Sequence, residues 1–399
     1  MAGLRPVKGL RPKSQINGGK SLSSFDIDGF LKSLCAVPHR AAGSEGEQRT
    51  LRLLEEELAK SGVEAHREVF RAPRTYIPLL WWLSGVLALA ILVPHWASFA
   101  LAVVFFWGAW RYFDWRKSFL TSLPPSINAT NLWAAKGEGP KRFILMAHHD
   151  SAPVSFAYRP SQVKNFRQSV ITGLVIMALC VVWAAAQLLG FYNFWVSLAL
   201  LVMLGIQMLV ATVDFVLYGY TNAANDNGTG VAAVLATAEK LWADVPACWS
   251  VEVLLTGAEE SGMIGAQKWV DAHIEELKNQ QVYVLNIDTV GAGHLCFVEK
   301  TGTLTTLDYE NPVVDAARAL SAEDERFSHV EAKAHRVADF DSVWFARKSI
   351  PVLTLGAYDE HGLMPHIHRP EDVLDHVDTD IVRETVEFAT ALSQRMMAG

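Results

Sequence analysis

The stretch Arg142-Phe143-Ile144-Leu145-Met146-Ala147-His148-His149-Asp150 indicates how this chain folds. An unbroken apolar run of this length is typical of a strand that is buried on both faces of a sheet. Similar runs lie at 250–255, 282–287 and 351–355, and helical patterns alternate with them at 230–241, 263–277 and 379–396. This alternation predicts the α/β class, with a mixed, mainly parallel sheet and helices on both faces.

Polar groups follow the predicted strands repeatedly. In an α/β sheet, ligands gather just beyond the carboxyl ends of the strands. A single aspartate there is usually a turn or cap residue, and a lone histidine is usually structural, but five groups in order are hard to explain as independent caps. These groups are residues 146–151, 224–230, 256–262, 286–289 and 366–372.

The chemistry of these groups is imidazole and carboxylate, without thiolate. Such a ligand set suits a hydrolytic zinc centre. Two imidazoles and three carboxylates are enough for two metal ions that share a bridging aspartate. The residues therefore predict a metal-dependent hydrolase site.

The composition is apolar for a soluble enzyme. Of the 399 residues, 51% are hydrophobic and 19% are charged, which excludes a disordered or fibrous chain. The net charge of −7 gives no reason to expect nucleic acid as a partner. The apolar excess lies in two stretches, 75–110 and 168–213, that contain no Asp, Glu, Lys or Arg.

Each stretch is long enough for a helical hairpin, because a membrane-spanning helix needs about 20 apolar residues. The expected spans are 77–93 and 96–112, then 169–189 and 194–216. Two alternatives are four buried helices of a large soluble core, and a first hairpin that enters only one leaflet. Lys and Arg occur in the flanks and in neither hairpin turn, which predicts a multi-pass membrane protein with its catalytic domain on the cytoplasmic side.

These patterns divide the chain into alternating catalytic and membrane segments. Because the second hairpin separates His148 from Asp226, we expect the site to open toward the membrane surface, covered by 154–167. The expected segments are a disordered tail (1–19), catalytic parts (20–74, 114–167 and 217–399) and transmembrane hairpins (75–113 and 168–216).

The order of the motifs resembles the zinc exopeptidases typified by bacterial leucyl aminopeptidase, aminopeptidase S and aminopeptidase Y, to which glutaminyl cyclases are related. The resemblance covers Arg40-Ala41-Ala42-Gly43-Ser44 and all five strand-end groups. It implies a zinc-exopeptidase-like fold with two co-catalytic zinc ions. It also implies Glu259 as the general base and Asp150 as the residue that orients His148.

The resemblance further implies how the metal ligands are shared. One ion would bind His148, Asp226 and Asp288, and the other would bind Asp226, Glu260 and His368. Two positions have neighbouring alternatives, because His149 could replace His148 and His366 could replace His368. One position departs from the family pattern: relatives often have Asp-His where this chain has Asp341-Ser342.

These observations predict a membrane-anchored zinc aminopeptidase that acts on peptides and has the lipid bilayer as its second partner. A glutaminyl cyclase, carboxypeptidase or deacylase on the same scaffold is one alternative. A non-catalytic membrane scaffold or receptor is another, although the complete ligand set argues against it. The sequence does not indicate an oligomeric state.

Overall fold

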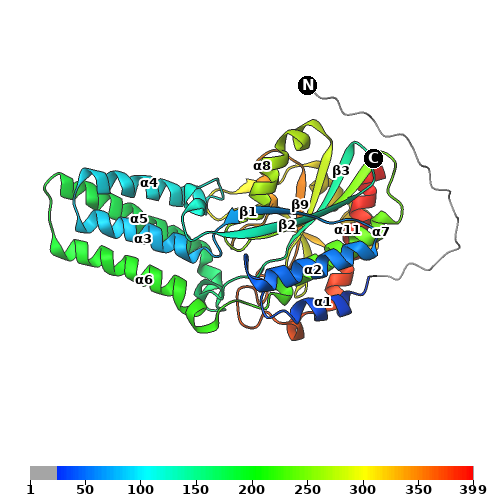
Figure 1. Ribbon diagram of the computed structural model, residues 1–399, viewed down its shortest axis with the longest axis horizontal. Coiled ribbons are helices and arrows are strands. Elements are labelled where there is room, and N and C mark those ends of the chain that lie inside the picture. The colour runs from blue at the N-terminus through cyan, green and yellow to red at the C-terminus, as the bar shows by residue number, and fades with distance from the viewer. Residues whose placement is uncertain (1–24, 399) are drawn as a thin grey trace, which may run out of the picture.

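The computed structural model describes residues 25–398, so the tail expected at 1–19 lies outside the described residues. These residues form an α/β unit from which four helices, α3 to α6, project as an elongated bundle (Figure 1). The two hairpins that form this bundle are inserted between strands of the sheet in the sequence, as expected.

A nine-stranded mixed sheet forms the centre of the α/β unit. Its order is β1-β2-β4-β3-β5-β9-β6-β7, with β8 beside β6. The four central strands β4, β3, β5 and β9 run parallel, whereas β1 and β2 on one side and β6 and β7 on the other add antiparallel pairs. The strands are β1 (His66–Ala72), β2 (Ile127–Lys136), β3 (Lys141–His148), β4 (Trp249–Thr256), β5 (Val282–Ile287), β6 (His294–Thr301), β7 (Leu307–Asp308), β8 (Glu331–Ala334) and β9 (Val352–Tyr358).

Helices cover both faces of this sheet. Helix α7 packs on β3 and β4, and α1 and α11 pack against α7 on the same face, where α9 packs against α11. Helix α8 lies on the opposite face (Figure 1), and α10 packs against α8. Every residue of β4 is buried, and its one charged side chain, Glu252, forms an ion pair with Arg142 of β3 at 2.7 Å. The expected α/β class is therefore confirmed. The helices are α1 (Ile27–Cys35), α2 (Glu45–Lys60), α7 (Gly230–Trp242), α8 (Ile264–Asn279), α9 (Pro312–Glu323), α10 (Ser342–Ala346) and α11 (Thr379–Ala398).

The bundle consists of two hairpins whose outer surface is apolar. On α6, Leu209 and Val216 are 64% and 74% exposed, which argues against the alternative of four helices buried in a soluble core. The four helices are α3 (Ile77–Leu92), α4 (Trp96–Phe113), α5 (Phe166–Leu188) and α6 (Phe194–Tyr218).

The two hairpins differ in length. Within residues 25–398, the segments long and apolar enough to cross a membrane are Val163–Leu188 and Phe194–Tyr218. Helix α3 has 16 residues and rises about 24 Å, less than the roughly 30 Å hydrocarbon core of a bilayer. The two longer expected spans thus correspond to helices that are long and apolar enough to cross a membrane, and the two expected short spans correspond to the shorter helices α3 and α4.

Candidate metal centre

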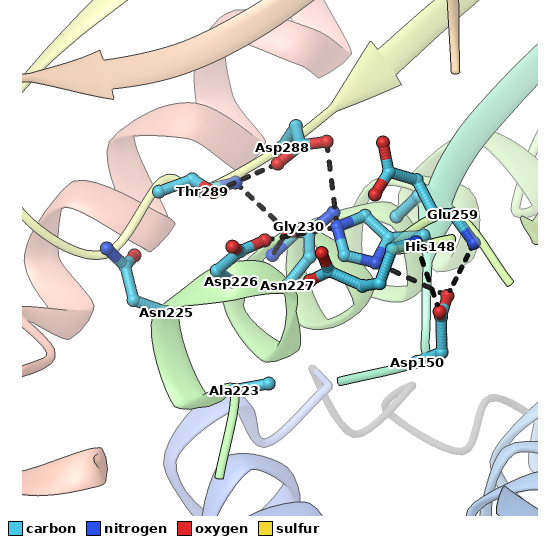
Figure 2. A network of polar contacts seen from close by, with 12 residues as sticks. His148, Asp150, Ala223, Asn225, Asp226, Asn227, Gly230, Glu259, Asp288 and Thr289 are labelled. Atoms are coloured by element: carbon cyan, nitrogen blue, oxygen red, sulfur yellow. Dashed lines mark hydrogen bonds and ion pairs between the residues drawn. The ribbon is translucent and has the colours of Figure 1, made fainter. Parts of the chain in front are cut away.

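The parallel strands bring the predicted site residues to one edge of the sheet. His148 ends β3, and the register that pairs Met146 with Asn286 places Asp288, just beyond β5, level with His148. Glu259 and Glu260 follow β4, and Asp226 lies immediately before α7. Figure 2 shows His148 surrounded by Asp226, Asp288, Asp150 and Glu259.

Asp226 lies between two histidines. Its Oδ1 is 3.2 Å from Nε2 of His148, and its Oδ2 is 3.4 Å from Nε2 of His368. Asp288 Oδ2 lies 3.7 Å from Nε2 of His148, and Glu260 Oε2 lies 3.1 Å from Nε2 of His368. The carboxylate of Asp226 thus presents one oxygen to each of two imidazole–carboxylate pairs.

The chemistry of this cluster fits a bound metal. His148, Asp226 and Glu260 are buried, and one ligand atom from each lies within 4.8 Å of the others. Among the described residues, Oε1 of Glu260 has no hydrogen-bond partner. Buried charged groups of this kind are normally paired or coordinate a metal. Nitrogen and oxygen ligands without sulfur suit catalytic zinc.

Burial raises the pKa values of three carboxyl groups in this cluster. The pKa of Glu260 rises to about 7 and that of Asp288 to about 6, chiefly because both are removed from water. Burial also raises the pKa of Glu259 well above its usual range. Glu259 is therefore suited to accept and hold a proton near neutral pH.

Asp150 contacts both halves of the site. Its Oδ1 and Oδ2 accept hydrogen bonds from the backbone N–H groups of Glu259 (3.0 Å) and Glu260 (3.3 Å). Its Oδ1 also lies 3.6 Å from Nδ1 of His148 (Figure 2). One carboxylate thereby holds the loop after β4 and lies against the ring edge of His148 that faces away from Asp226.

The alternative histidines face elsewhere. Nε2 of His149 lies 3.0 Å from the carbonyl oxygen of Thr130, and His366 stacks on His376 with ring centroids 4.8 Å apart. The structure thus brings His148 and His368 to the carboxylates, and not their neighbours.

Two further residues hold the site but received no role from the sequence. Arg40 is fully buried and donates hydrogen bonds to the carbonyl oxygens of His149 (2.8 Å), Asn222 (2.8 Å) and Ala223 (2.7 Å). It thereby joins the segment after His148 to the one before Asp226. The sequence could have indicated a role for Arg40, because this residue begins the N-terminal motif Arg40-Ala41-Ala42-Gly43-Ser44.

Asp372 supports the same segment from the other side. Its carboxylate accepts hydrogen bonds from the backbone N–H groups of Asn225 (2.6 Å) and Asp226 (3.2 Å). Asp341, where the chain departs from the family pattern, is buried and accepts a hydrogen bond from the hydroxyl of Thr256. Its role here is a contact with the end of β4.

The helical bundle also touches the site. Tyr158, in the segment expected to cover the site, stacks on His368 with ring centroids 4.0 Å apart. From α4, Tyr112 donates its hydroxyl to the carbonyl oxygen of Ser261 (3.1 Å), beside the two glutamates. The first hairpin is therefore attached to the loop that carries the two glutamates, and the segment that leads into α5 contacts His368.

An α/β sheet with a buried imidazole–carboxylate cluster beyond its parallel strands is the arrangement expected of a zinc-exopeptidase-like fold. Residues 206–393 match the model of Peptidase family M28. This stretch includes Asp226, Glu259 and His368, whereas His148 and Asp150 precede it.

Two curated relatives are aminopeptidases. The chain is 28% identical over 175 residues to Aminopeptidase YwaD of Bacillus subtilis, covering 43% of this chain and 37% of the relative. It is 29% identical over 181 residues to the Probable lipoprotein aminopeptidase LpqL of Mycobacterium tuberculosis, covering 39% and 35%. The chain thus matches little more than a third of the length of these relatives.

Solved structures share the fold over nearly the whole chain. A Zn-dependent exopeptidase from Parabacteroides distasonis has a TM-score of 0.56 at 14% identity and covers 94% of this chain and 99% of its own. A glutaminyl cyclase from Fimbriiglobus ruber has a TM-score of 0.57 at 13% identity and covers 96% and 99%. These likenesses show that the chain has a zinc-exopeptidase-like fold.

Proposed function

We propose that this protein is a membrane-anchored di-zinc aminopeptidase that removes N-terminal residues from peptides. The observation that carries the proposal is the position of Asp226, with one carboxylate oxygen toward His148 and the other toward His368. This arrangement fits a bridging ligand between two ions, and Glu259 lines the same cavity.

The chain offers a ligand set for each ion. His148, Asp226 and Asp288 would hold one, and Asp226, Glu260 and His368 would hold the other. When bound, zinc lowers the pKa of a water ligand to about 7 and polarises the carbonyl group of the substrate.

Glu259 takes the proton of the attacking water and delivers it to the leaving amine. Positioned proton transfer of this kind contributes roughly 10²- to 10⁴-fold to a rate. Asp150 favours the tautomer of His148 that carries its proton on Nδ1 and leaves Nε2 free toward Asp226. Partners of this kind are worth about 10- to 100-fold in metal affinity or activity.

Glu259→Gln tests this assignment directly. We expect turnover to fall by roughly 10²- to 10⁴-fold because the proton acceptor is lost, while about two zinc ions per chain remain. Mass spectrometry of incubated peptides measures loss of the first residue, and elemental analysis measures zinc. Glu275→Gln, an exposed position on α8, is the matched control. Activity retained in Glu259→Gln would reject Glu259 as the base, and a zinc-free wild-type chain would reject the proposal.

A glutaminyl cyclase is the second candidate, because solved glutaminyl cyclases share this fold. A peptide with N-terminal glutamine distinguishes the two reactions. Cyclisation releases ammonia and keeps the residue, whereas an aminopeptidase releases the residue itself.

The bundle supports membrane anchoring. The exposed apolar surface of α5 and α6 has the composition of lipid-facing helices, and both hairpins begin and end at the α/β unit. We propose that this unit lies on the cytoplasmic side, since Lys and Arg flank the hairpins and are missing from their turns.

A further inference from the structure

One cavity joins the metal-ligand cluster to the interior of the bundle. It has a volume of about 510 Å³, and Glu259, Glu260 and His368 line one end of it. Gly173 and Met177 of α5 and Gln207 of α6 line the other. The membrane hairpins therefore form part of the substrate-binding cavity as well as an anchor.

The cavity reaches deep into the bundle and is bordered there by accessible side chains. Met177 lies 11 residues beyond the start of α5 at Phe166, about 16 Å along the helix axis. Ile206 and Val210 of α6 line the cavity and are also 55% and 37% exposed. Access to the cavity past these two side chains would come from the hydrocarbon region if α5 and α6 cross the membrane.

The polarity of the lining changes along the cavity. Gln168, Ser169 and Thr172 lie on the part of α5 nearer the α/β unit, whereas Leu174, Ile176 and Met177 lie farther along the helix. Among residues 25–398, Oε1 of Gln207 has no hydrogen-bond donor, although it is buried from solvent. A ligand with amide N–H groups beside a long apolar chain would match both features.

We propose that this cavity selects amide substrates that carry a long apolar chain and draws them from the bilayer between α5 and α6. The inference rests on the proposed function. The amide to be cleaved would lie at the metal-ligand cluster, and the chain would remain in the bundle. Water adds its hydroxyl group to the carbonyl carbon, the C–N bond breaks, and the amine leaves with a proton. The chain could be a lipid-type alkyl group or an apolar peptide segment.

Two glycines provide a matched pair of variants. A Cβ atom at Gly173 would lie 3.1 Å from Nε2 of Gln207, so Gly173→Leu would fill the cavity between α5 and α6. A Cβ at Gly205 of α6 would meet nothing within 4 Å, so Gly205→Leu would only extend the outer surface. Both changes replace glycine by a good helix former, which makes their effects on the helix comparable.

Photo-crosslinking tests binding without turnover. The full chain carrying Glu259→Gln is placed in lipid nanodiscs with a leucine-initiated peptide that bears an alkyl chain ending in a diazirine. A second probe carries an apolar peptide segment with a diazirine in place of the alkyl chain. Comparison of the two probes shows whether the cavity binds an alkyl chain or an apolar peptide segment.

For at least one probe, we expect competable crosslinks at the cavity-lining positions 172–174, 176–177, 206–207 and 210–211, beyond those at lipid-facing Val202 and Leu209. Gly173→Leu should reduce them about tenfold, because each buried methylene contributes to binding, and Gly205→Leu should not. Equal labelling of Val202 and Leu209, or no effect of Gly173→Leu, would overturn the inference.

Activity of the protein with native Glu259 separates this inference from the proposed function. We expect kcat/KM to favour the chain-bearing peptide over the same peptide without the chain by about tenfold, and Gly173→Leu to abolish that preference. Specific crosslinking with no hydrolysis of either peptide would reject the proposed function but would still support binding of an apolar chain in this cavity. Hydrolysis of both peptides with equal kcat/KM would reject the selection of apolar chains.

Discussion

At the scale of single residues, Arg40 links two segments that must meet for the site to form. Its guanidinium group donates to three carbonyl oxygens, one just beyond His148 and two just before Asp226, and the bonds to His149 and Ala223 are buried. Because the Arg40 side chain donates to backbone atoms of both segments, it fixes their positions relative to each other. The distance between His148 and Asp226 therefore depends on a residue that donates no hydrogen bond to either side chain.

Arg40→Met should lower the thermal stability and the zinc content together. Each carbonyl left without a donor costs about 1–3 kcal/mol, so the loss should be about 3 kcal/mol or more. Thermal unfolding and elemental analysis measure the two effects. Arg49→Met, which removes an exposed cation paired with Glu45 one helical turn away, is the control and should change little. An unchanged melting temperature in Arg40→Met would contradict this positioning effect.

At the scale of elements, an ion pair connects α6 to the segment that covers the site. Arg159 donates to both oxygens of Asp214, at 2.8 Å and 2.5 Å. Asp214 is only 2% exposed, and the residue before Arg159 is Tyr158, whose ring stacks on His368. The position of α6 is thereby linked to the position of the His368 ring, a predicted metal ligand.

Removing one partner of this pair should cost more than removing both. Arg159→Met leaves the buried carboxylate of Asp214 without its cation and should lower the stability, because an uncompensated buried charge is unfavourable. The double variant Arg159→Met/Asp214→Asn should recover much of that loss, because no uncompensated charge remains. Unfolding in detergent and peptidase activity measure the effect. If the double variant is as unstable as Arg159→Met alone, the charge of Asp214 is not the cause.

At the scale of the whole molecule, both hairpins return the chain to the same α/β unit (Figure 1). The membrane anchoring that we propose therefore requires this unit to lie on one side of the membrane. Cys248 is exposed on this unit, while Cys180 and Cys296 are buried. Burial raises the pKa of half-buried Cys35 to about 11, which keeps its thiol unreactive near neutral pH. Chemical labelling of Cys248 can therefore show on which side of a membrane the α/β unit lies.

A membrane-impermeant maleimide should label Cys248 only after cells are permeabilised, because we place the α/β unit in the cytoplasm. Gel-shift analysis of the labelled protein measures the reaction, and Cys248→Ser should remove the signal. Labelling of Cys248 in intact cells would place the unit, and with it the peptidase site, outside the cytoplasm.

Periodicity and apolar runs in the sequence determined most of the elements. The strand Val282–Ile287 has the expected bounds, and α3 begins at Ile77 as predicted. Such local signals arise from the burial of side chains on one element, so one stretch of sequence contains them. The short strands β7 and β8 were missed, because their few, mostly solvent-accessible residues carry no such signal.

Only the tertiary structure decided which neighbouring side chains share a site. His148 and His149 are equivalent by sequence, but successive side chains of a strand point to opposite sides, and the packing of β3 beside β4 turns His148 toward Asp226. The cavity between α5 and α6 and the hydrogen bonds of Arg40 were likewise decided only by the tertiary structure. Each depends on segments far apart in the chain that meet only when the sheet and the hairpins pack together.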